Sequence, residues 1–162
     1  MMNTNKVLAL YPNTRCIGHI TLEWPETLID YGTFSVRPLC DERLLKGAKK
    51  TIEYFNPEVV LIRNCETTTL RGKRAQHLME TIEQYAKEIN VPVYKYTREQ
   101  VRDVFEQFQA KTKYDIMKKL VAWYPELKWR EPKVREVWDD ESPNMSIFDA
   151  LALAVTHKYL TE

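Results

Sequence analysis

The sequence predicts one α/β domain, spanning residues 1–162, with a five-stranded mixed sheet and helices on both faces. Three observations support this prediction. First, 162 residues with 44% hydrophobic content suit a single domain with a substantial core. Second, three strand patterns follow one another through short turns, which favours antiparallel neighbours. Third, two later strand patterns each follow a helical pattern, which favours parallel strands joined by crossovers.

Residues 6–10, 15–23 and 27–36 give the three antiparallel strands. The first segment is mainly a short apolar run, whereas the other two alternate between apolar and polar residues. Turn-forming residues separate the three segments, at 12–14 and 24–27. The middle strand should therefore lie antiparallel to both of its neighbours.

The rest of the chain alternates between helical and strand patterns. Apolar residues with helical spacing occur at 41–55 and 73–90, and a short strand pattern follows each of them, at 59–62 and 91–96. A strand reached through a helix is typical of a parallel sheet, so the first, fourth and fifth strands should be parallel. We expect two shorter helices, a polar irregular stretch and a closing helix at 99–107, 114–123, 124–145 and 146–159.

Composition argues against several classes of protein. With 4 glycines the chain has no glycine-rich phosphate loop, and a formal net charge of +1 is not that of a strongly basic nucleic-acid binder. Cys16, Cys40 and Cys65 lie far apart, which suits reduced thiols better than a disulfide framework or a zinc site. The sequence has no signal-peptide pattern and no apolar run of about 18 residues, so we expect a cytoplasmic protein without a membrane partner.

Two motifs carry a resemblance to a known family. VLALYPNTRCIGHITLE, followed by LIDYGTFSV, has a turn proline and two strand glycines at Pro12, Gly18 and Gly32. SIFDALALAVTH contains the pattern Asp-Ala-x-Ala-x-Ala-x-x-His, which begins at Asp149. With PEVVLIRN and NVPVYKYTREQVR between them, these motifs resemble the RuvC Holliday-junction resolvases of the ribonuclease H-like superfamily along nearly the whole chain. The resemblance implies a ribonuclease H-like fold, a DNA partner and a homodimer.

The resemblance also implies a nuclease site, which this chain keeps only in part. In the family, four carboxylates hold two divalent metal ions, which clamp the attacking and leaving oxygens of a phosphodiester. Three of these positions fall on Tyr11, Arg63 and Ser146, and only Asp149 keeps its acid. Because one carboxylate is too few for two hard cations, the sequence predicts a vacated metal site, no metal cofactor and no cleavage.

An alternative stays open, in which rearranged acidic residues hold Mg²⁺ or Mn²⁺ and the protein is an active endonuclease of the Holliday-junction type. The candidate ligands are then Asp149, Glu66, Asp139, Asp140 and Glu141. Each has a simpler interpretation. Glu66 should point away from the face of its strand that carries Arg63. The acidic run 139–141 suits a solvated loop, and Asp149 with Ser146 fits a capping box, which we favour.

Arg63 is expected to take over part of the role of the missing metal ions. It ends an apolar strand, where an unpaired guanidinium is costly to bury. We expect Arg63 beside Tyr11 and Asp149, where it would neutralise the remaining carboxylate through a charge-assisted hydrogen bond.

Basic residues supply the candidate nucleic-acid contacts, which are Arg71, Lys73, Arg74, Lys111 and Lys113. A second group mixes aromatic rings with positive charges, as stacking and phosphate contact require: Trp129, Arg130, Lys133, Arg135 and Trp138. Ordinary surface charge is the alternative for both groups. The predicted function is binding of branched or duplex DNA without cleavage, and a protein–protein interaction module on the same fold is a further alternative.

Overall fold

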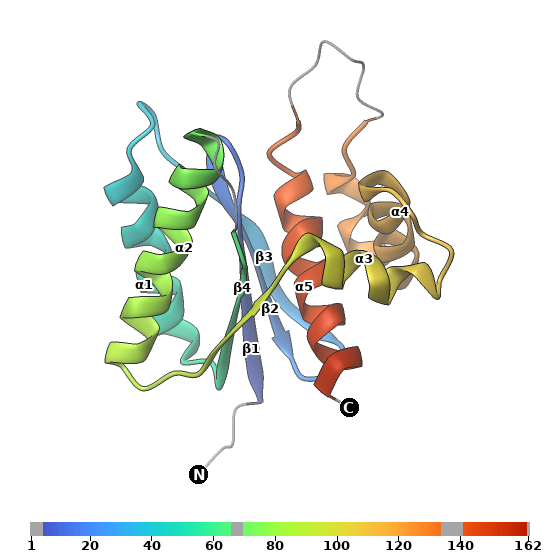
Figure 1. Cartoon of the computed structure of the whole chain (residues 1–162), viewed down its shortest axis with the longest axis horizontal. Helices are drawn as coiled ribbons and strands as arrows, with labels where there is room; N and C mark the ends of the chain where they lie inside the picture. The colour runs from blue at the N-terminus through green and yellow to red at the C-terminus, as the bar shows by residue number, and fades with distance from the viewer. Residues whose placement is uncertain (1–4, 66–69, 134–140, 162) are drawn as a thin grey trace.

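The computed structural model describes residues 5–65, 70–133 and 141–161, and these contain a five-stranded sheet (Figure 1). Its strands are β1 (Lys6–Pro12), β2 (Cys16–Glu23), β3 (Thr27–Ser35), β4 (Val59–Arg63) and β5 (Val93–Tyr96). They lie in the order β3-β2-β1-β4-β5. β2 is antiparallel to β1 and β3, whereas β1, β4 and β5 are parallel. The predicted strand directions are therefore confirmed.

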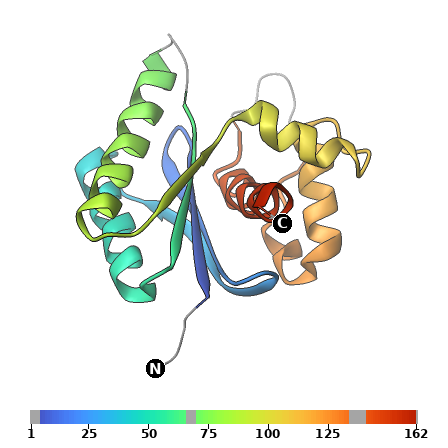
Figure 2. The ribbon, with the colours of Figure 1, turned by 60° about the horizontal axis from the view of Figure 1, so that its bottom comes forward.

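Helices cover both faces of the sheet, as Figures 1 and 2 show. One face carries α1 (Asp41–Phe55) and α2 (Leu70–Glu88). On the other face lies α5 (Met145–Thr161), against which α3 (Arg98–Glu106) and α4 (Lys113–Trp123) pack. The stretch predicted to be irregular contains a short 3₁₀ helix, η1 (Pro125–Arg130). Among the helices that the structure describes, none combines the length and the hydropathy needed to cross a lipid bilayer.

The alternation of side chains along each strand divides the core into two parts. Leu8 and Leu10 of β1 pack with residues of α1 and α2, whereas Tyr11 packs on the side of α5. Leu61 of β4 also belongs to the core on the α5 side, so Arg63, two residues later, is directed to that side as well. The period of the strands thus decides which residues can meet at the end of the sheet.

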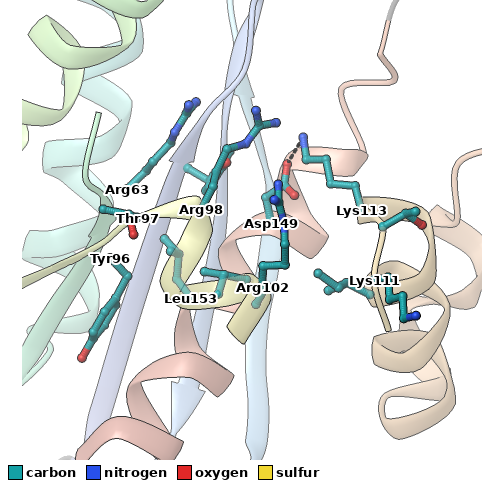
Figure 3. Close-up of a pocket in the computed structure, with 14 residues that line it drawn as sticks. Arg63, Tyr96, Thr97, Arg98, Arg102, Lys111, Lys113, Asp149 and Leu153 are labelled. Carbon is teal, nitrogen blue, oxygen red and sulfur yellow. Dashed lines mark ion pairs between the residues drawn. The ribbon is translucent and has the colours of Figure 1, made fainter. Parts of the chain in front are cut away.

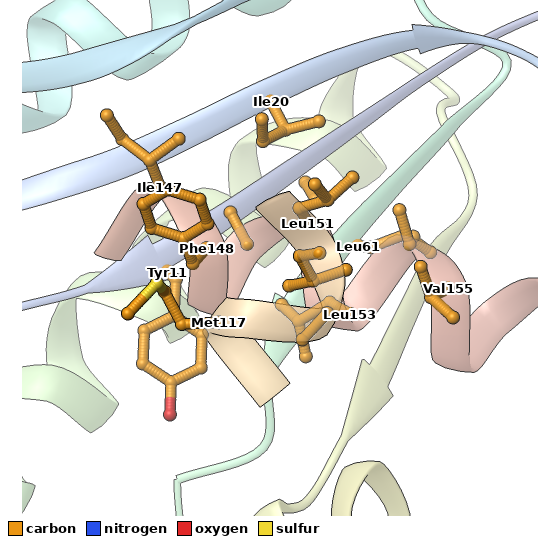
Figure 4. Close-up of a cluster of buried hydrophobic side chains, with 14 of the residues drawn as sticks. Tyr11, Ile20, Leu61, Met117, Ile147, Phe148, Leu151, Leu153 and Val155 are labelled. Atoms are coloured by element: carbon orange, nitrogen blue, oxygen red, sulfur yellow. The ribbon is translucent and has the colours of Figure 1, made fainter. Parts of the chain in front are cut away.

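α5 is buried along most of its length, because it lies between the sheet and the layer of α3 and α4. Every residue from Met145 to His157 is buried, and Figure 4 shows apolar side chains of α5 together with those of its neighbours Ile20, Leu61 and Met117. The start of α5 lies very close to β2. A Cβ atom added at Gly18 would lie 2.4 Å from the carbonyl carbon and oxygen of Ser146, so this position requires glycine.

Candidate functional site

The three parallel strands end side by side, and their last side chains meet on the face covered by α5. Arg63 is the register partner of Tyr96, and Tyr11 lies one residue beyond the pair of Leu10 with Ile62. The carboxyl ends of parallel strands share one edge of the sheet, so Tyr11, Arg63 and Tyr96 lie in a row. This edge is where open α/β sheets hold their ligands.

A cavity of about 330 Å³ opens at this edge, between the strand ends, α3, the start of α4 and the middle of α5 (Figure 3). The side chains that line it include five basic ones, which are Arg63, Arg98, Arg102, Lys111 and Lys113. Asp149 is the one carboxylate among its lining residues in the part of the chain that the structure describes. The wall of the cavity is therefore strongly positive, although the whole chain has a net charge of only +1.

Lys113 joins two carboxylates at one end of the cavity. Its Nζ lies 3.0 Å from Oδ2 of Asp149 and donates to both carboxylate oxygens of Glu141, at 2.9 and 3.0 Å. The same ammonium lies 5.8 Å from the centre of the Tyr11 ring, within the range of a cation–π contact. The structure therefore gives Lys113 the place beside Asp149 that the sequence predicts for Arg63, and that prediction was wrong.

Burial controls the ionisation of this group. It raises the pKa of Asp149 from 3.8 to about 6, against the opposing effect of the nearby Lys113 ammonium. For Lys113 burial acts to lower the pKa, but the charges of Asp149, Tyr11 and Glu141 together outweigh it and raise the pKa. Burial, reinforced by Asp149, also raises the pKa of the Tyr11 hydroxyl, so the tyrosine stays neutral at pH 7.

Arg63 is held by an aromatic ring. Its guanidinium carbon lies 5.5 Å from the centre of the Tyr11 ring, so the predicted proximity of these two residues is confirmed. Within the described ranges, its buried Nε finds no hydrogen-bond acceptor. Arg63 therefore brings a positive charge to the cavity without forming the predicted pair with Asp149.

Tyr96 connects the cavity to the far half of α5. Tyr96 is one of the residues that line the cavity, and its hydroxyl lies 2.5 Å from Nδ1 of His157, so the two buried side chains share a hydrogen bond. Trp24 and Tyr94 surround the same imidazole with their rings. These contacts give His157 a structural role between α5 and the sheet.

No protein-family model matches the chain, and no curated protein matches it. Several solved structures are similar to it. RuvC of T. thermophilus in complex with a Holliday junction substrate is 17% identical, with a TM-score of 0.70, over 96% of this chain and 94% of that chain. A further Thermus thermophilus RuvC structure is 18% identical, with a TM-score of 0.66, over 96% and 95%. The Fowlpox virus resolvase in complex with Holliday junction DNA is 10% identical, with a TM-score of 0.54, over 95% and 99%. The chain has a RuvC-like, ribonuclease H-like fold.

The donor set at the end of the RuvC-like sheet does not fit two divalent metal ions. At the four positions that the resemblance assigns to carboxylates, the chain has a phenol, a guanidinium, a hydroxyl and one carboxylate, and a lysine ammonium already pairs with that carboxylate. In the described part of the chain, no three or more His, Cys, Asp or Glu side chains come close enough to hold a metal ion. Glu66, Asp139 and Asp140, the alternative ligands, lie outside the described residues.

Ser146 and Asp149 do not form the capping box that the sequence favoured. α5 begins at Met145, so Ser146 lies within the first turn, and its hydroxyl donates to the carbonyl of Pro143 at 2.6 Å. The Asp149 carboxylate pairs with Lys113. The capping interpretation was wrong because the helix starts earlier than predicted and because a cation from α4 reaches the carboxylate.

The candidate nucleic-acid contacts differ in how free they are. Lys73 and Lys111 are exposed, whereas Lys113 already has two carboxylate partners. Arg74 binds Asp41 through two nitrogens, at 2.7 and 3.0 Å, and donates to the carbonyl of Thr14 at 3.0 Å. Arg74 therefore links α2 to α1 and to the turn after β1. For Arg71 the side chain lies outside what the structure describes. Contact with nucleic acid is untested for all five residues, and the intramolecular partners of Arg74 favour a structural role for it instead.

The aromatic and basic group before α5 is described only in part, since Arg135 and Trp138 lie outside the described residues. Trp129 is exposed, and its ring nitrogen donates to the Tyr31 hydroxyl at 2.7 Å. The guanidinium of Arg130 lies 4.5 Å from the centre of the Trp129 ring. Trp129 and Arg130 are not among the residues that line the cavity, and stacking of nucleic acid on this group stays a prediction.

Two cavity residues, Arg98 and Arg102, were not among the predicted site residues. They lie four positions apart in α3, so both fall on one face of the helix. Thr97 caps α3 through a capping box with Gln100, which sets Arg98 at the first position of the helix, beside the end of β5. The signal in the sequence was the spacing R-x-x-x-R, whose first arginine lies within the TREQ capping motif. That this face of the helix is directed toward the end of the sheet could be seen only from the fold.

Proposed function

We propose that this chain is a RuvC-like protein that binds DNA, in branched or duplex form, and does not cleave it. The observation that carries the proposal is that basic side chains line the cavity at the end of the sheet, where the resemblance implies metal-binding carboxylates. Two of the similar structures, RuvC of T. thermophilus and the Fowlpox virus resolvase, are complexes with Holliday junctions, which supports a junction as the first ligand to test.

Basic side chains in place of metal-binding carboxylates favour binding of a phosphate over its cleavage. Metal ions in a nuclease attract the phosphate and also activate the attacking water. Guanidinium and ammonium groups supply the attraction, with several hydrogen-bond donors each, but they do not lower the pKa of water as a bound metal ion does. The homodimer is part of the same proposal, because two copies would match the two-fold symmetry of a junction.

A salt series on a four-way junction and a matched duplex tests the proposal. Binding should weaken as salt rises, because each phosphate contact releases counterions, with a log–log slope of about −0.9 per contact on duplex DNA. Arg98→Gln with Arg102→Gln should flatten this slope. Lys46→Gln with Lys50→Gln removes the same charge from exposed positions of α1, on the other face of the sheet, and should change the slope less. No binding at low salt would favour the protein–protein module.

The same substrates incubated with Mg²⁺ or Mn²⁺ test the absence of cleavage. Strand scission that Asp149→Asn abolishes would overturn the proposal in favour of the endonuclease with rearranged ligands. Light scattering with and without junction DNA measures the oligomeric state. A monomer under both conditions would contradict the homodimer.

A further inference from the structure

The cavity has two chemically different parts. Figure 3 shows the charged ends of Arg63, Arg98, Arg102 and Lys113 directed toward the same end of the cavity, whereas that of Lys111 is directed away. The remaining lining is mainly apolar and comes from Val101 of α3, Ile116 of α4, and Ala152 and Leu153 of α5. A ligand that fills this cavity should therefore carry an anionic group at one end and an apolar body at the other.

The positive end has charge left for a ligand. Lys113 is already compensated, because Asp149 and Glu141 both contact its ammonium. Arg98 and Arg102 are exposed, and neither forms an ion pair with a carboxylate in the ranges that the structure describes. Their forked guanidinium groups match a phosphate, which accepts several hydrogen bonds at once.

Two helices begin at the cavity and add to its positive potential. Arg98 and Lys113 are the first residues of α3 and α4, and the threonine before each of them also lines the cavity. The amino-terminal end of a helix carries a partial positive charge that favours anions. The backbone dipoles and the arginines thus act in the same direction.

We propose that the cavity binds a single nucleotide, with its phosphate at Arg98, Arg102 and Arg63 and its base or sugar against Val101, Ile116 and Leu153. A volume of about 330 Å³ is at the lower end for small-molecule sites and has no room for a base-paired duplex. The inference rests on the proposed function and adds to it that the DNA ligand contributes an unpaired nucleotide, which leaves the stack to enter the cavity.

Calorimetry with free compounds tests the chemistry of the site. Thymidine monophosphate should bind more tightly than inorganic phosphate, and thymidine should bind most weakly, because the cavity recognises both parts of the nucleotide. Arg98→Gln with Arg102→Gln should lower the affinity for thymidine monophosphate by about 10-fold or more, as expected for lost hydrogen bonds to a charged group. The control Lys46→Gln with Lys50→Gln should leave its affinity unchanged.

A second variant separates the apolar contact from the charge. Val101→Gln, at a half-buried position, should lower the affinity for thymidine monophosphate and leave the affinity for inorganic phosphate unchanged. Urea unfolding of each variant establishes that it is folded. Equal affinities of the wild-type protein for monophosphate and phosphate, or failure of both to bind, would overturn the inference.

DNA ligands separate this inference from the proposed function. A duplex with a one-nucleotide bulge should bind more tightly than the perfect duplex, and thymidine monophosphate should compete with the bulge. Salt-dependent binding of junctions without preference for the bulge and without competition would refute the nucleotide site and leave the proposed function intact. Binding of the monophosphate without binding of any DNA would refute the proposed function and identify a free nucleotide as the ligand.

Discussion

The buried carboxylate of Asp149 should make the stability of the protein depend on pH, and Asp149→Asn should remove this dependence. Burial raises the pKa of Asp149 from 3.8 to about 6, so folding favours its protonated form. The stability that this group contributes is complete below about pH 4, falls as the pH rises through 6, and is constant above that. Asparagine has nearly the same shape but stays neutral throughout.

The size of the effect follows from the difference between the two pKa values. A rise from 3.8 to about 6 corresponds to about 3 kcal/mol. Asp149→Asn should therefore be more stable than the wild-type protein by up to about 3 kcal/mol at pH 7.5, and about equally stable at pH 4. Urea unfolding, followed by tryptophan fluorescence between pH 4 and 8, measures the free energy of unfolding of the wild-type protein and of the variant. Asp103→Asn, at an exposed position of α3, is the matched control and should show no comparable gain.

Two results would refute this reasoning. If Asp149→Asn is less stable than the wild-type protein at every pH, the ion pair with Lys113 outweighs the cost of burying the carboxylate. If Mg²⁺ stabilises the wild-type protein at pH 7.5 but not the variant, Asp149 binds a metal ion, which would favour the endonuclease alternative.

Three further substitutions test other parts of the structure by the same unfolding measurement. Gly18→Ala should lower the free energy of unfolding by about 1–3 kcal/mol, because its Cβ would meet the backbone of Ser146 at 2.4 Å. Gly47→Ala is the control and should be nearly neutral, since the nearest side-chain atom lies at 3.3 Å. Equal effects of the two substitutions would contradict the close approach of α5 to β2. Lys113→Met should destabilise the protein by about 1–3 kcal/mol at pH 7.5, because it leaves two carboxylates unpaired, and clearly less at pH 5. Arg74→Ala should cost about 1 kcal/mol of stability yet leave the salt slope of DNA binding unchanged, and a flatter slope would return this residue to the nucleic-acid interface.

The strand directions and the face on which Tyr11 and Arg63 meet could be predicted because they depend on local patterns. A period of two places Arg63 on the same face as Leu61, and a helix between two strands makes them parallel. The proximity of the tyrosine to the arginine needs the strand order as well, in which β1 lies beside β4, and the family resemblance implied that order.

The partner of Asp149 could not be predicted in the same way. Lys113 comes from the first turn of α4, and the position of that helix depends on how α3 and α4 pack on α5. Arg98 and Arg102 were missed for the same reason, since their spacing shows that they share a helix face but not where that face points. Contacts between elements that are joined by loops depend on side-chain packing, which the periodicity of the sequence does not encode.

The hydrogen bond between Tyr96 and His157 provides an intrinsic spectroscopic probe of whether the cavity is occupied. Burial raises the pKa of Tyr96 to about 12 and lowers that of His157, so neither side chain titrates near pH 7.5. A ligand that touches the Tyr96 ring would change its hydroxyl contact with Nδ1 and with it the ¹⁵N chemical shifts of the imidazole. The chain has 3 histidines, which makes those resonances simple to assign, so nuclear magnetic resonance could follow ligand entry without any label inside the cavity.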